Sequence, residues 1–384
     1  MIVFLLLFAP CIVGMPMGGT ASAIIMPTHM DTGKLPRECF SCHAGHGMGG
    51  TPMLKGGTSM VCLSCHGSKA RVTRVGGMNT LMPPDMDIET ALLKPYHHPF
   101  DAGEGYDAKG AKYPQTNPRA PRRADCGDCH DVHASTEQDP LARVDGINSY
   151  GLRAPVASHE YEICFKCHAD SANLPDDERN MRLLFNPQNP SFHPVEGPGK
   201  GHDEPSLIAP LTAGSVITCS DCHGDDDSGG PKGPHGSDYA AILAANYIKQ
   251  DGPETSNEYA LCYKCHDRNS ILRDQSFPCH NLHIVKVGAS CFDCHDAHGS
   301  TTNAHLIHFN PDEVFAPPAV PSAGQSSLNL QAGQAALRYS ALPLIGETPL
   351  SRGGIELGRY VDLGNGHGEC FLTCHGKVHN PLSY

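Results

Sequence analysis

The stretch CFSCH, residues 39–43, is the first of seven C-x-x-C-H motifs in this chain of 384 residues. An eighth motif, CFLTCH at residues 370–375, has one more residue between its cysteines. Together the eight motifs use 16 of the 18 Cys and leave only Cys11 and Cys279 outside. In chain order, motifs one to eight are Cys39/Cys42/His43, Cys62/Cys65/His66, Cys126/Cys129/His130, Cys164/Cys167/His168, Cys219/Cys222/His223, Cys262/Cys265/His266, Cys291/Cys294/His295 and Cys370/Cys374/His375.

The composition predicts a fold without a large core of apolar side chains. Hydrophobic residues make up 39% of the chain, there is no Trp, and 41 Gly and 32 Pro favour turns. Such a chain buries too little apolar area to offset its conformational entropy unless something else fills its interior. The formal net charge of −13 argues against nucleic acid as a partner.

Three kinds of site use paired cysteines. A tight turn can present two thiolates to one zinc ion, and exported proteins form disulfides, but neither requires a His directly after the second Cys. His is one residue in sixteen here, yet it follows all eight pairs. C-x-x-C-H is the attachment motif of c-type haem. In one helical turn its two Cys and its His lie on one face, so the thiols can form thioethers while the His ligates iron.

The sequence therefore predicts eight covalently attached haems. It also predicts the fold class: a mostly irregular chain with short α-helices and few strands, wrapped around the haem array of a multihaem cytochrome c. The second axial ligand of each iron decides the chemistry, because His or Met closes the site for electron transfer and an open position permits catalysis. Sixteen His remain after the eight motif His, whereas no Met recurs at a fixed offset, so we expect bis-histidine ligation.

An internal repeat selects among the remaining histidines. The motifs form four units of two, and each unit has a His upstream of its first motif and another shortly after it. The predicted second ligands are His29, His46, His98, His133, His193, His235, His283 and His298, with His379 as a further candidate. The alternative for each is a surface or hydrogen-bonding His, and the histidines left over are His159, His202, His305, His308 and His367.

Two of these choices lie between near neighbours. His98 precedes Pro99 as His193 precedes Pro194, which favours His98 over His97. His283 precedes an apolar run, which favours it over His280.

The N-terminal segment resembles a targeting signal. An apolar run over residues 2–15 is followed by Ala21-Ser22-Ala23, which is typical of a secretory signal peptide over residues 1–23. An uncleaved anchor and lipidation at Cys11 are the alternatives. The run is too short to predict a membrane span, so we expect an exported chain, in the periplasm or at the cell surface, with no span in its mature part. The predicted haem pairs occupy residues 24–76, 77–180, 181–275 and 276–384, with a Pro-rich insertion at 309–368.

The sequence resembles a known family over residues 39–379. Its paired motifs, the upstream His-Pro, and stretches such as CHDAHGS and EICFKCH are similar to those of doubled C-x-x-C-H multihaem cytochromes, of the cytochrome c3-like type found in metal-reducing bacteria. The resemblance implies closely stacked haems, in alternating parallel and T-shaped pairs, that carry electrons to redox partner proteins or an extracellular acceptor. Some related groups polymerise into filaments, so the resemblance also implies a homopolymer as one form of assembly. Cys279 and the long stretch before motif eight depart from the family pattern.

Two alternative functions fit the same motifs. A multihaem reductase or oxidase acting on nitrite, hydroxylamine or a sulfur oxyanion would keep one haem open, and a filament subunit would stack its terminal haems on those of the next copy.

Three local features can also be predicted. Residues 237–247 (SDYAAILAANY) predict a helix, and residues 355–363 predict a strand or hairpin. The run Asp225-Asp226-Asp227 predicts a solvated loop, with calcium binding as the alternative.

Overall fold

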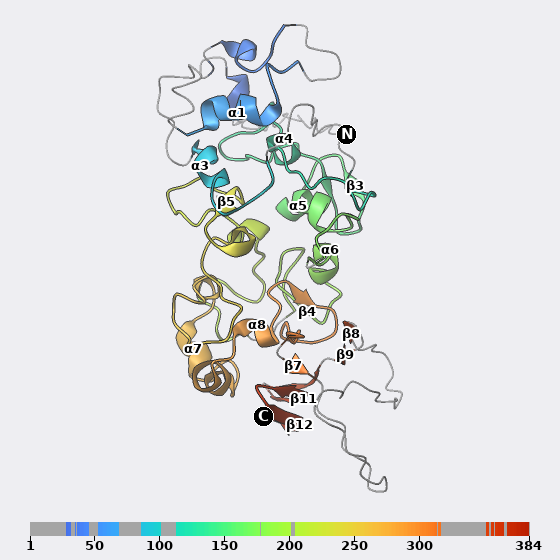
Figure 1. Ribbon diagram of the computed structural model, residues 1–384, viewed down its shortest axis with the longest axis vertical. Helices are drawn as coiled ribbons and strands as arrows, with labels where there is room; N and C mark the ends of the chain where they lie inside the picture. Colours follow the sequence, from blue (N-terminus) through green and yellow to red (C-terminus); the bar gives the residue numbers. More distant parts are fainter. Residues whose placement is uncertain are drawn as a thin grey trace, which may run out of the picture.

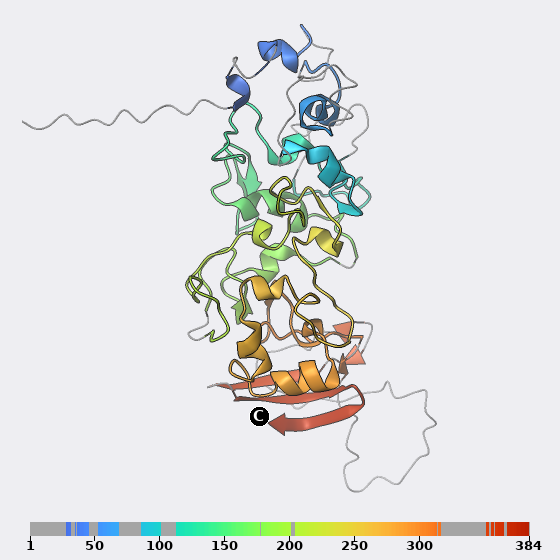
Figure 2. The ribbon, with the colours of Figure 1, turned by 90° about the vertical axis from the view of Figure 1, so that its left-hand side faces the viewer.

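The computed structural model forms an elongated body in which the chain progresses from one end to the other (Figures 1 and 2). It describes residues 28–31, 35, 37–45, 53–68, 86–100, 113–176, 178–200, 204–312, 314–315, 351–352, 355–356, 358–364 and 367–383. Helix α1, which carries motif two, lies towards one end, and strand β11, which carries most of motif eight, lies at the other. The order of the motifs in the sequence is thus kept along the long axis.

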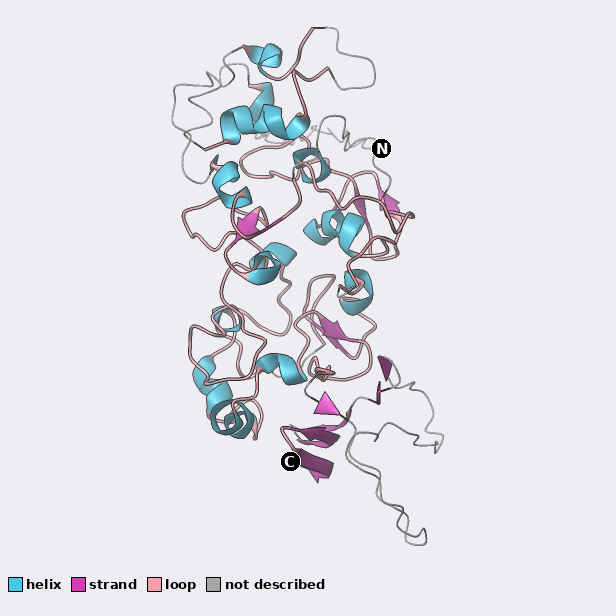
Figure 3. Ribbon diagram, viewed as in Figure 1, coloured by secondary structure: helices cyan, strands magenta, loops and turns pink. Residues whose placement is uncertain are grey.

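Short elements joined by loops make up this body (Figure 3), as predicted for the fold class. The helical segments are η1 (Thr28–Met30), η2 (Glu38–Ser41), α1 (Thr58–His66), α3 (Ile88–Leu92), α4 (Cys126–Cys129), α5 (Glu160–His168), α6 (Met181–Leu184), η5 (Cys219–Asp221), η6 (Ala240–Ile242), η7 (Cys262–Lys264), α7 (Arg268–Leu272), the π-helix η8 (Asn281–Val287) and α8 (Cys291–Cys294). The strands are β1 (Tyr96–His97), β2 (Gly146–Ile147), β3 (Arg153–Ala154), β4 (Ser191–Phe192), β5 (Gly236–Ser237), β6 (Gly299–Ser300), β7 (Val314–Phe315), β8 (Ser351–Arg352), β9 (Ile355–Glu356), β10 (Arg359–Gly364), β11 (His367–Cys374) and β12 (Lys377–Ser383).

The seven strict motifs fold as helical turns. In five of them the amide of the motif His donates to the carbonyl of the first Cys, as from His43 to Cys39 at 3.0 Å and from His130 to Cys126 at 2.9 Å. In α1 and α5 the motif closes a nine-residue helix. The turn brings the two Cys and the His of a motif to one side of the backbone, as the spacing predicts.

An aspartate inside the motif fixes the turn in motifs three, five and seven. Its carboxylate accepts a hydrogen bond from the amide three residues earlier, from Asp125 to Asp128 at 2.7 Å, from Thr218 to Asp221 at 2.7 Å, and from Ser290 to Asp293 at 3.1 Å. Such reciprocal caps satisfy amides that a short turn leaves unpaired. The sequence pattern D/T/S-C-x-D-C-H therefore encodes a capped turn.

Two-residue ladders join neighbouring units. Strand β1 pairs antiparallel with β5, and β4 with β6, so each ladder connects the segment before a His-Pro to a His-Gly-Ser of the next unit. At the corresponding place in the first unit, the amide of Thr28 donates to the carbonyl of Ser135 at 3.1 Å. These short ladders join segments that are far apart in the sequence.

Glycines in the ladders lie against backbone. A Cβ on Gly299 would be 2.1 Å from the carbonyl oxygen of Leu184. We expect Gly299→Ala to lower the free energy of unfolding of the haem-loaded protein by about 1–3 kcal/mol, because a backbone atom has to move. Gly252→Ala is the matched control, since a Cβ there meets nothing within 4 Å. Thermal unfolding of both variants checks the prediction, and equal midpoints would contradict it.

The apolar core is small, as the composition predicts. One cluster of buried side chains among the described residues consists of Ile147, Tyr161, Phe165, Ala169, Phe185 and Val195. A second consists of Phe309, Val314 and Leu372 beside the motif residues Cys294, Cys370 and Cys374. Clusters of this size leave the space around the motif thiols to be filled by something other than side chains.

The C-terminal sheet is the largest in the described part of the chain. Strands β10, β11 and β12 pair in that order, and β7 pairs with the end of β11. The predicted strand or hairpin over residues 355–363 is confirmed by β9, which pairs with β8, and by β10. Residues 316–350 of the Pro-rich insertion lie outside the described residues.

The predicted helix over residues 237–247 is wrong. Strand β5 ends at Ser237, and η6 is three residues long with Ala241 and Ile242 at positive φ values of 58° and 54°. The carbonyl of Ala241 accepts a hydrogen bond from Nδ1 of His223 at 2.8 Å. Tertiary contact with a motif His thus overrides the local helix propensity of an Ala-rich run.

The acidic run at residues 225–227 is also not simply a solvated loop. The ammonium of Lys94 contacts carboxylate oxygens of Asp225 and Asp226, the latter at 2.7 Å, and the Asp225 side chain is only 4% exposed. The lysine supplies the positive charge that the alternative prediction assigned to calcium. In the described part of the chain, no helix is long and apolar enough to cross a bilayer.

Candidate haem-binding sites

Each His of the seven strict motifs faces one other histidine ring. The separations of the ring centres fall between 5.9 and 6.4 Å. The pairs are His43 with His133 (6.0 Å), His66 with His29 (5.9 Å), His130 with His235 (6.3 Å), His168 with His98 (6.1 Å), His223 with His298 (6.2 Å), His266 with His193 (6.4 Å) and His295 with His280 (6.3 Å). Every pair thus combines a motif His with a His from another segment.

These separations suit a metal ion held between the two rings. An imidazole nitrogen binds a transition metal at about 2 Å, and the ring centre lies roughly 1 Å further, which places two rings on opposite sides of one ion about 6 Å apart. Ordinary aromatic pairs have a wider range; here they extend from 5.1 Å, for Tyr161 with Phe165, to 6.4 Å, for Tyr247 with Tyr259. The narrow range in all seven pairs therefore fits shared coordination of iron.

Backbone carbonyls orient many of these rings. Nδ1 of His98 donates to the carbonyl of Pro234 at 2.8 Å, Nδ1 of His130 to that of Pro140 at 3.0 Å, and Nδ1 of His295 to that of His305 at 2.8 Å. A carbonyl only accepts, so Nδ1 carries the proton and Nε2 keeps its lone pair for a metal. His193 is held in the same way by the carbonyl of Ala297, and His223 by that of Ala241.

Burial favours the unprotonated form of the paired rings. It lowers the pKa of His235, His266 and His298 to about 4, with nearby charged groups as smaller causes. At neutral pH these rings are uncharged. Neutral imidazole is the form that ligates a metal.

The pairs follow a regular scheme across the four units. In units one to three, the His upstream of a unit faces the second motif of that unit: His29 faces motif two, His98 motif four and His193 motif six. The His that follows the first motif of a unit faces the first motif of the unit before. His133, His235 and His298 thus face motifs one, three and five. The ladders β1–β5 and β4–β6 hold the two supplying segments together.

The fourth unit differs, and here the sequence missed a residue. His280, not His283, faces motif seven. His280 is the N-cap of η8, three residues before His283. The sequence did offer a signal for His280. CHNLH contains two histidines upstream of motif seven, whereas each earlier unit uses one upstream histidine as a ligand. His46 lies outside the described residues.

The eighth motif is built differently. Cys370 and Cys374 lie on strand β11 rather than in a helical turn. The ring nitrogens of His375 face Asp251 at 3.4 Å and Asp293 at 3.6 Å. His379 on β12 instead faces His283, with ring centres 6.4 Å apart.

Thiols of consecutive motifs lie close enough together for one to influence the pKa of the other, and this holds for every step from motif one to motif eight. The neighbouring thiols are Cys42 with Cys65, Cys62 with Cys126, Cys129 with Cys167, Cys164 with Cys219, Cys222 with Cys265, Cys262 with Cys291, and Cys294 with Cys374. Within a unit, the second Cys of one motif is near the second Cys of the other motif. Between units, the first Cys of one motif is near the first Cys of the next motif. Two kinds of junction therefore alternate along the array.

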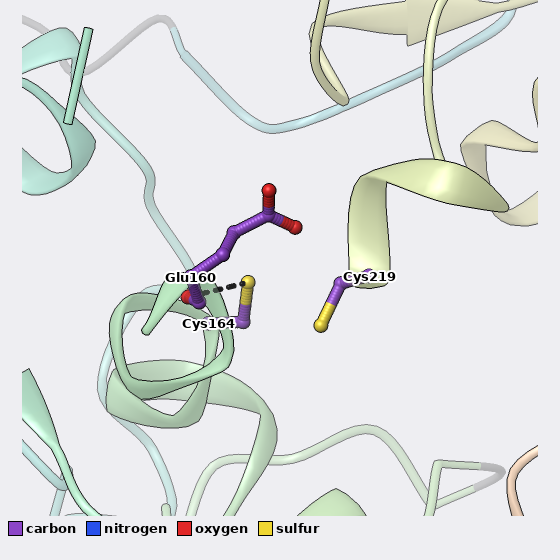
Figure 4. A group of neighbouring side chains, drawn as sticks. All are labelled: Glu160, Cys164 and Cys219. Carbon is purple, nitrogen blue, oxygen red and sulfur yellow. Dashed lines mark hydrogen bonds between the residues drawn. The ribbon is translucent and has the colours of Figure 1, made fainter. Parts of the chain in front are cut away.

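Figure 4 shows one of these junctions. The Sγ atoms of Cys164 and Cys219 and a carboxylate oxygen of Glu160 lie within 4.8 Å of one another. Glu160 accepts hydrogen bonds from the amide of Ser220 at 2.8 Å and from its hydroxyl at 2.7 Å. The carboxylate thus fastens motif five to the helix that carries motif four, and both thiols belong to attachment motifs. We therefore do not assign a separate metal centre here.

Two family models match the chain. Residues 35–191, with motifs one to four, match the model of the outer membrane cytochrome MtrC/MtrF-like family, domains II/IV. Residues 209–270, with motifs five and six, match the model of the doubled CXXCH motif. No curated protein and no solved structure matches the chain.

Proposed function

The chain is a multihaem c-type cytochrome, and from this premise we propose that it relays electrons through eight bis-histidine haems in extracellular electron transfer. The motifs indicate covalently bound haem c, and the matched families indicate an electron carrier. The number of haems, their ligands and their use as one continuous path are the proposal.

The observation that carries the proposal is the set of seven histidine pairs described above. When bound, each haem supplies an iron that cycles between the ferric and ferrous states. The protein residues supply both axial ligands, because every strict-motif His has a partner ring at 5.9–6.4 Å. Two histidines leave no iron position for a substrate, and they favour lower potentials than a His and a Met would.

The arrangement of the motifs supports a single path. Thiols of consecutive motifs are neighbours, and the chain follows the long axis from motif one to motif eight (Figure 1). Each haem would therefore adjoin those of the motifs before and after it. Electrons entering at one end would pass through the motifs in sequence order.

The alternative function is a multihaem oxidoreductase with one open iron. We expect the reduced protein to have only low-spin haem and its spectrum to be unchanged by carbon monoxide, because both axial positions of every iron are taken by His. Visible spectra with and without carbon monoxide check this, and intact mass should show eight haems per chain. A high-spin or carbon monoxide-binding fraction in the native protein would favour the enzyme.

The name of the first matched family supports export towards the outer membrane. Residues 1–23, the predicted signal peptide, lie outside the described residues. We propose that the protein acts in the periplasm or on the cell surface, with redox partner proteins or an extracellular acceptor. Cell fractionation followed by protease treatment of intact cells would separate the two locations.

An end-to-end homopolymer is compatible with this proposal, because motifs one and eight belong to opposite ends of the elongated body. Copies joined through these ends would continue the path. Negative-stain microscopy of the exported fraction tests for filaments, and monodisperse particles alone would remove the idea.

A further inference from the structure

We propose that the iron of the eighth haem is ligated by His379 and His283, and that His375, although it follows Cys374 directly, ligates no iron. The inference rests on the proposed function, because it requires a haem at motif eight. The ligand would then stand five residues after the second Cys instead of next to it.

The pair His283 and His379 repeats the geometry of the other seven pairs. Its ring centres are 6.4 Å apart, as are those of His193 and His266. Nδ1 of His283 donates to the carbonyl of Cys279 at 2.8 Å, which leaves Nε2 as the ligating atom. His379 is 8% exposed, and its Nδ1 is buried without a hydrogen-bond partner among the described residues. The pair therefore offers two facing imidazoles, of which His379 is buried and His283 is half-buried.

His375 is engaged elsewhere. Its Nδ1 lies 3.4 Å from a carboxylate oxygen of Asp251 and its Nε2 lies 3.6 Å from one of Asp293, whose side chain is 1% exposed. The residue adopts a positive φ of 49° in the turn between β11 and β12, which turns it away from the strand direction. Ligation of iron through Nε2 would separate that nitrogen from the Asp293 carboxylate, whereas it would leave the contact of Nδ1 with Asp251 intact. In the structure Nε2, the nitrogen that would bind iron, faces Asp293 of motif seven instead.

The register of the sheet brings His379 to the face of the two thiols. Successive residues of a strand alternate between faces, so Cys370, Leu372 and Cys374 share one face of β11. His379 pairs directly with Leu372 across β11 and β12, and directly paired residues share a face. Both thiols lie within electrostatic reach of Cys294 of motif seven. The thiols, His379 and the preceding motif thus meet on one side of the sheet.

The scheme of the units selects the same pair. In units one to three, the second motif is faced by a His from upstream of its own unit. In the fourth unit, His280 faces motif seven, so His283 is the upstream ring that remains for motif eight. The ring that His283 faces is His379, not His375.

Substitutions in the full-length haem-loaded protein test the assignment. We expect His379→Ala to retain eight haems by intact mass and to give one high-spin haem that binds carbon monoxide when reduced, about one eighth of the total haem. His375→Ala should keep every haem low-spin and unresponsive to carbon monoxide. Any carbon monoxide-binding fraction in His375→Ala would overturn the assignment.

A second variant covers the case in which His379→Ala is not produced as folded protein. His379→Met offers a thioether ligand, and we expect it to keep eight low-spin haems while the midpoint potential of one haem rises. An unchanged potentiometric titration would overturn the assignment. A native protein with seven haems would overturn the octahaem proposal as well, whereas eight haems with a responsive His375→Ala would overturn this inference alone.

Discussion

Replacing His98 with alanine should convert one low-spin haem into a high-spin haem that binds carbon monoxide, and replacing the adjacent His97 should not. His98 faces His168 of motif four with ring centres 6.1 Å apart, and its Nδ1 is fixed by the carbonyl of Pro234. His97 is exposed in strand β1, and its Nδ1 lies 2.8 Å from the carbonyl of His98. Loss of one axial ligand opens a position on one iron.

The size of the effect follows from the number of motifs. One haem in eight should change, so about an eighth of the reduced haem should bind carbon monoxide in His98→Ala. His97→Ala is the matched control, because it removes the same side chain one residue away. Added imidazole should restore the low-spin spectrum of His98→Ala if the defect is only the missing ligand. Equal spectra of the two variants would contradict the pairing of His98 with His168.

The sequence predicted the motif turns well because their chemistry is local. Two thiols and an imidazole must reach one haem from one turn, so their spacing alone determines the conformation. The residue before a proline is biased towards extended backbone, and both His98 and His193 precede a proline. Extended backbone is what a residue directly after a strand needs, and His98 and His193 directly follow strands β1 and β4.

The parts that could not be predicted depend on contacts between units. A ladder of two residues has too few positions to show a periodic pattern, so β5 and β6 could not be recognised in GPHGS and AHGS. The run around Ala241 favours a helix locally, but its carbonyl is used to orient His223. The pairing of His280 with motif seven and of His283 with His379 depends on how the fourth unit folds back on itself, which its local sequence does not show.

Replacing Lys166 with methionine should lower the midpoint potentials of the haems at motifs three and four. The side chain of Lys166 is 5% exposed, and its ammonium lies 3.2 Å from a carboxylate oxygen of Asp145 and donates to the carbonyl of Asp128. It lies within electrostatic reach of Cys129 and Cys167, one thiol of each motif. A buried positive charge favours ferrous over ferric iron, because reduction removes one unit of positive charge.

The charge environment sets the expected size of this shift. A unit charge roughly 10 Å from an iron contributes about 1–2 kcal/mol at an effective dielectric constant near 20, which corresponds to several tens of millivolts for one electron. Burial raises the pKa of the Asp145 carboxyl, but Lys166 and Arg153 hold it below its usual value. In Lys166→Met, Arg153 remains 2.8 Å from a carboxylate oxygen of Asp145 and still lowers the pKa of that carboxyl. The Asp145 charge is then balanced only by the exposed Arg153, and this acts in the same direction as the loss of Lys166.

Lys264 provides the matched control for Lys166. It occupies the same place in motif six and donates to the carbonyl of Asp221 at 2.5 Å, but its side chain is exposed. Water screens an exposed charge, so Lys264→Met should shift potentials by less than half as much as Lys166→Met. Spectroelectrochemical titration of both variants at neutral pH measures the difference. Methionine is unbranched and similar in length to lysine but carries no charge, so the substitution tests the charge alone. An unchanged or raised potential in Lys166→Met would show that this ammonium does not act on the haems.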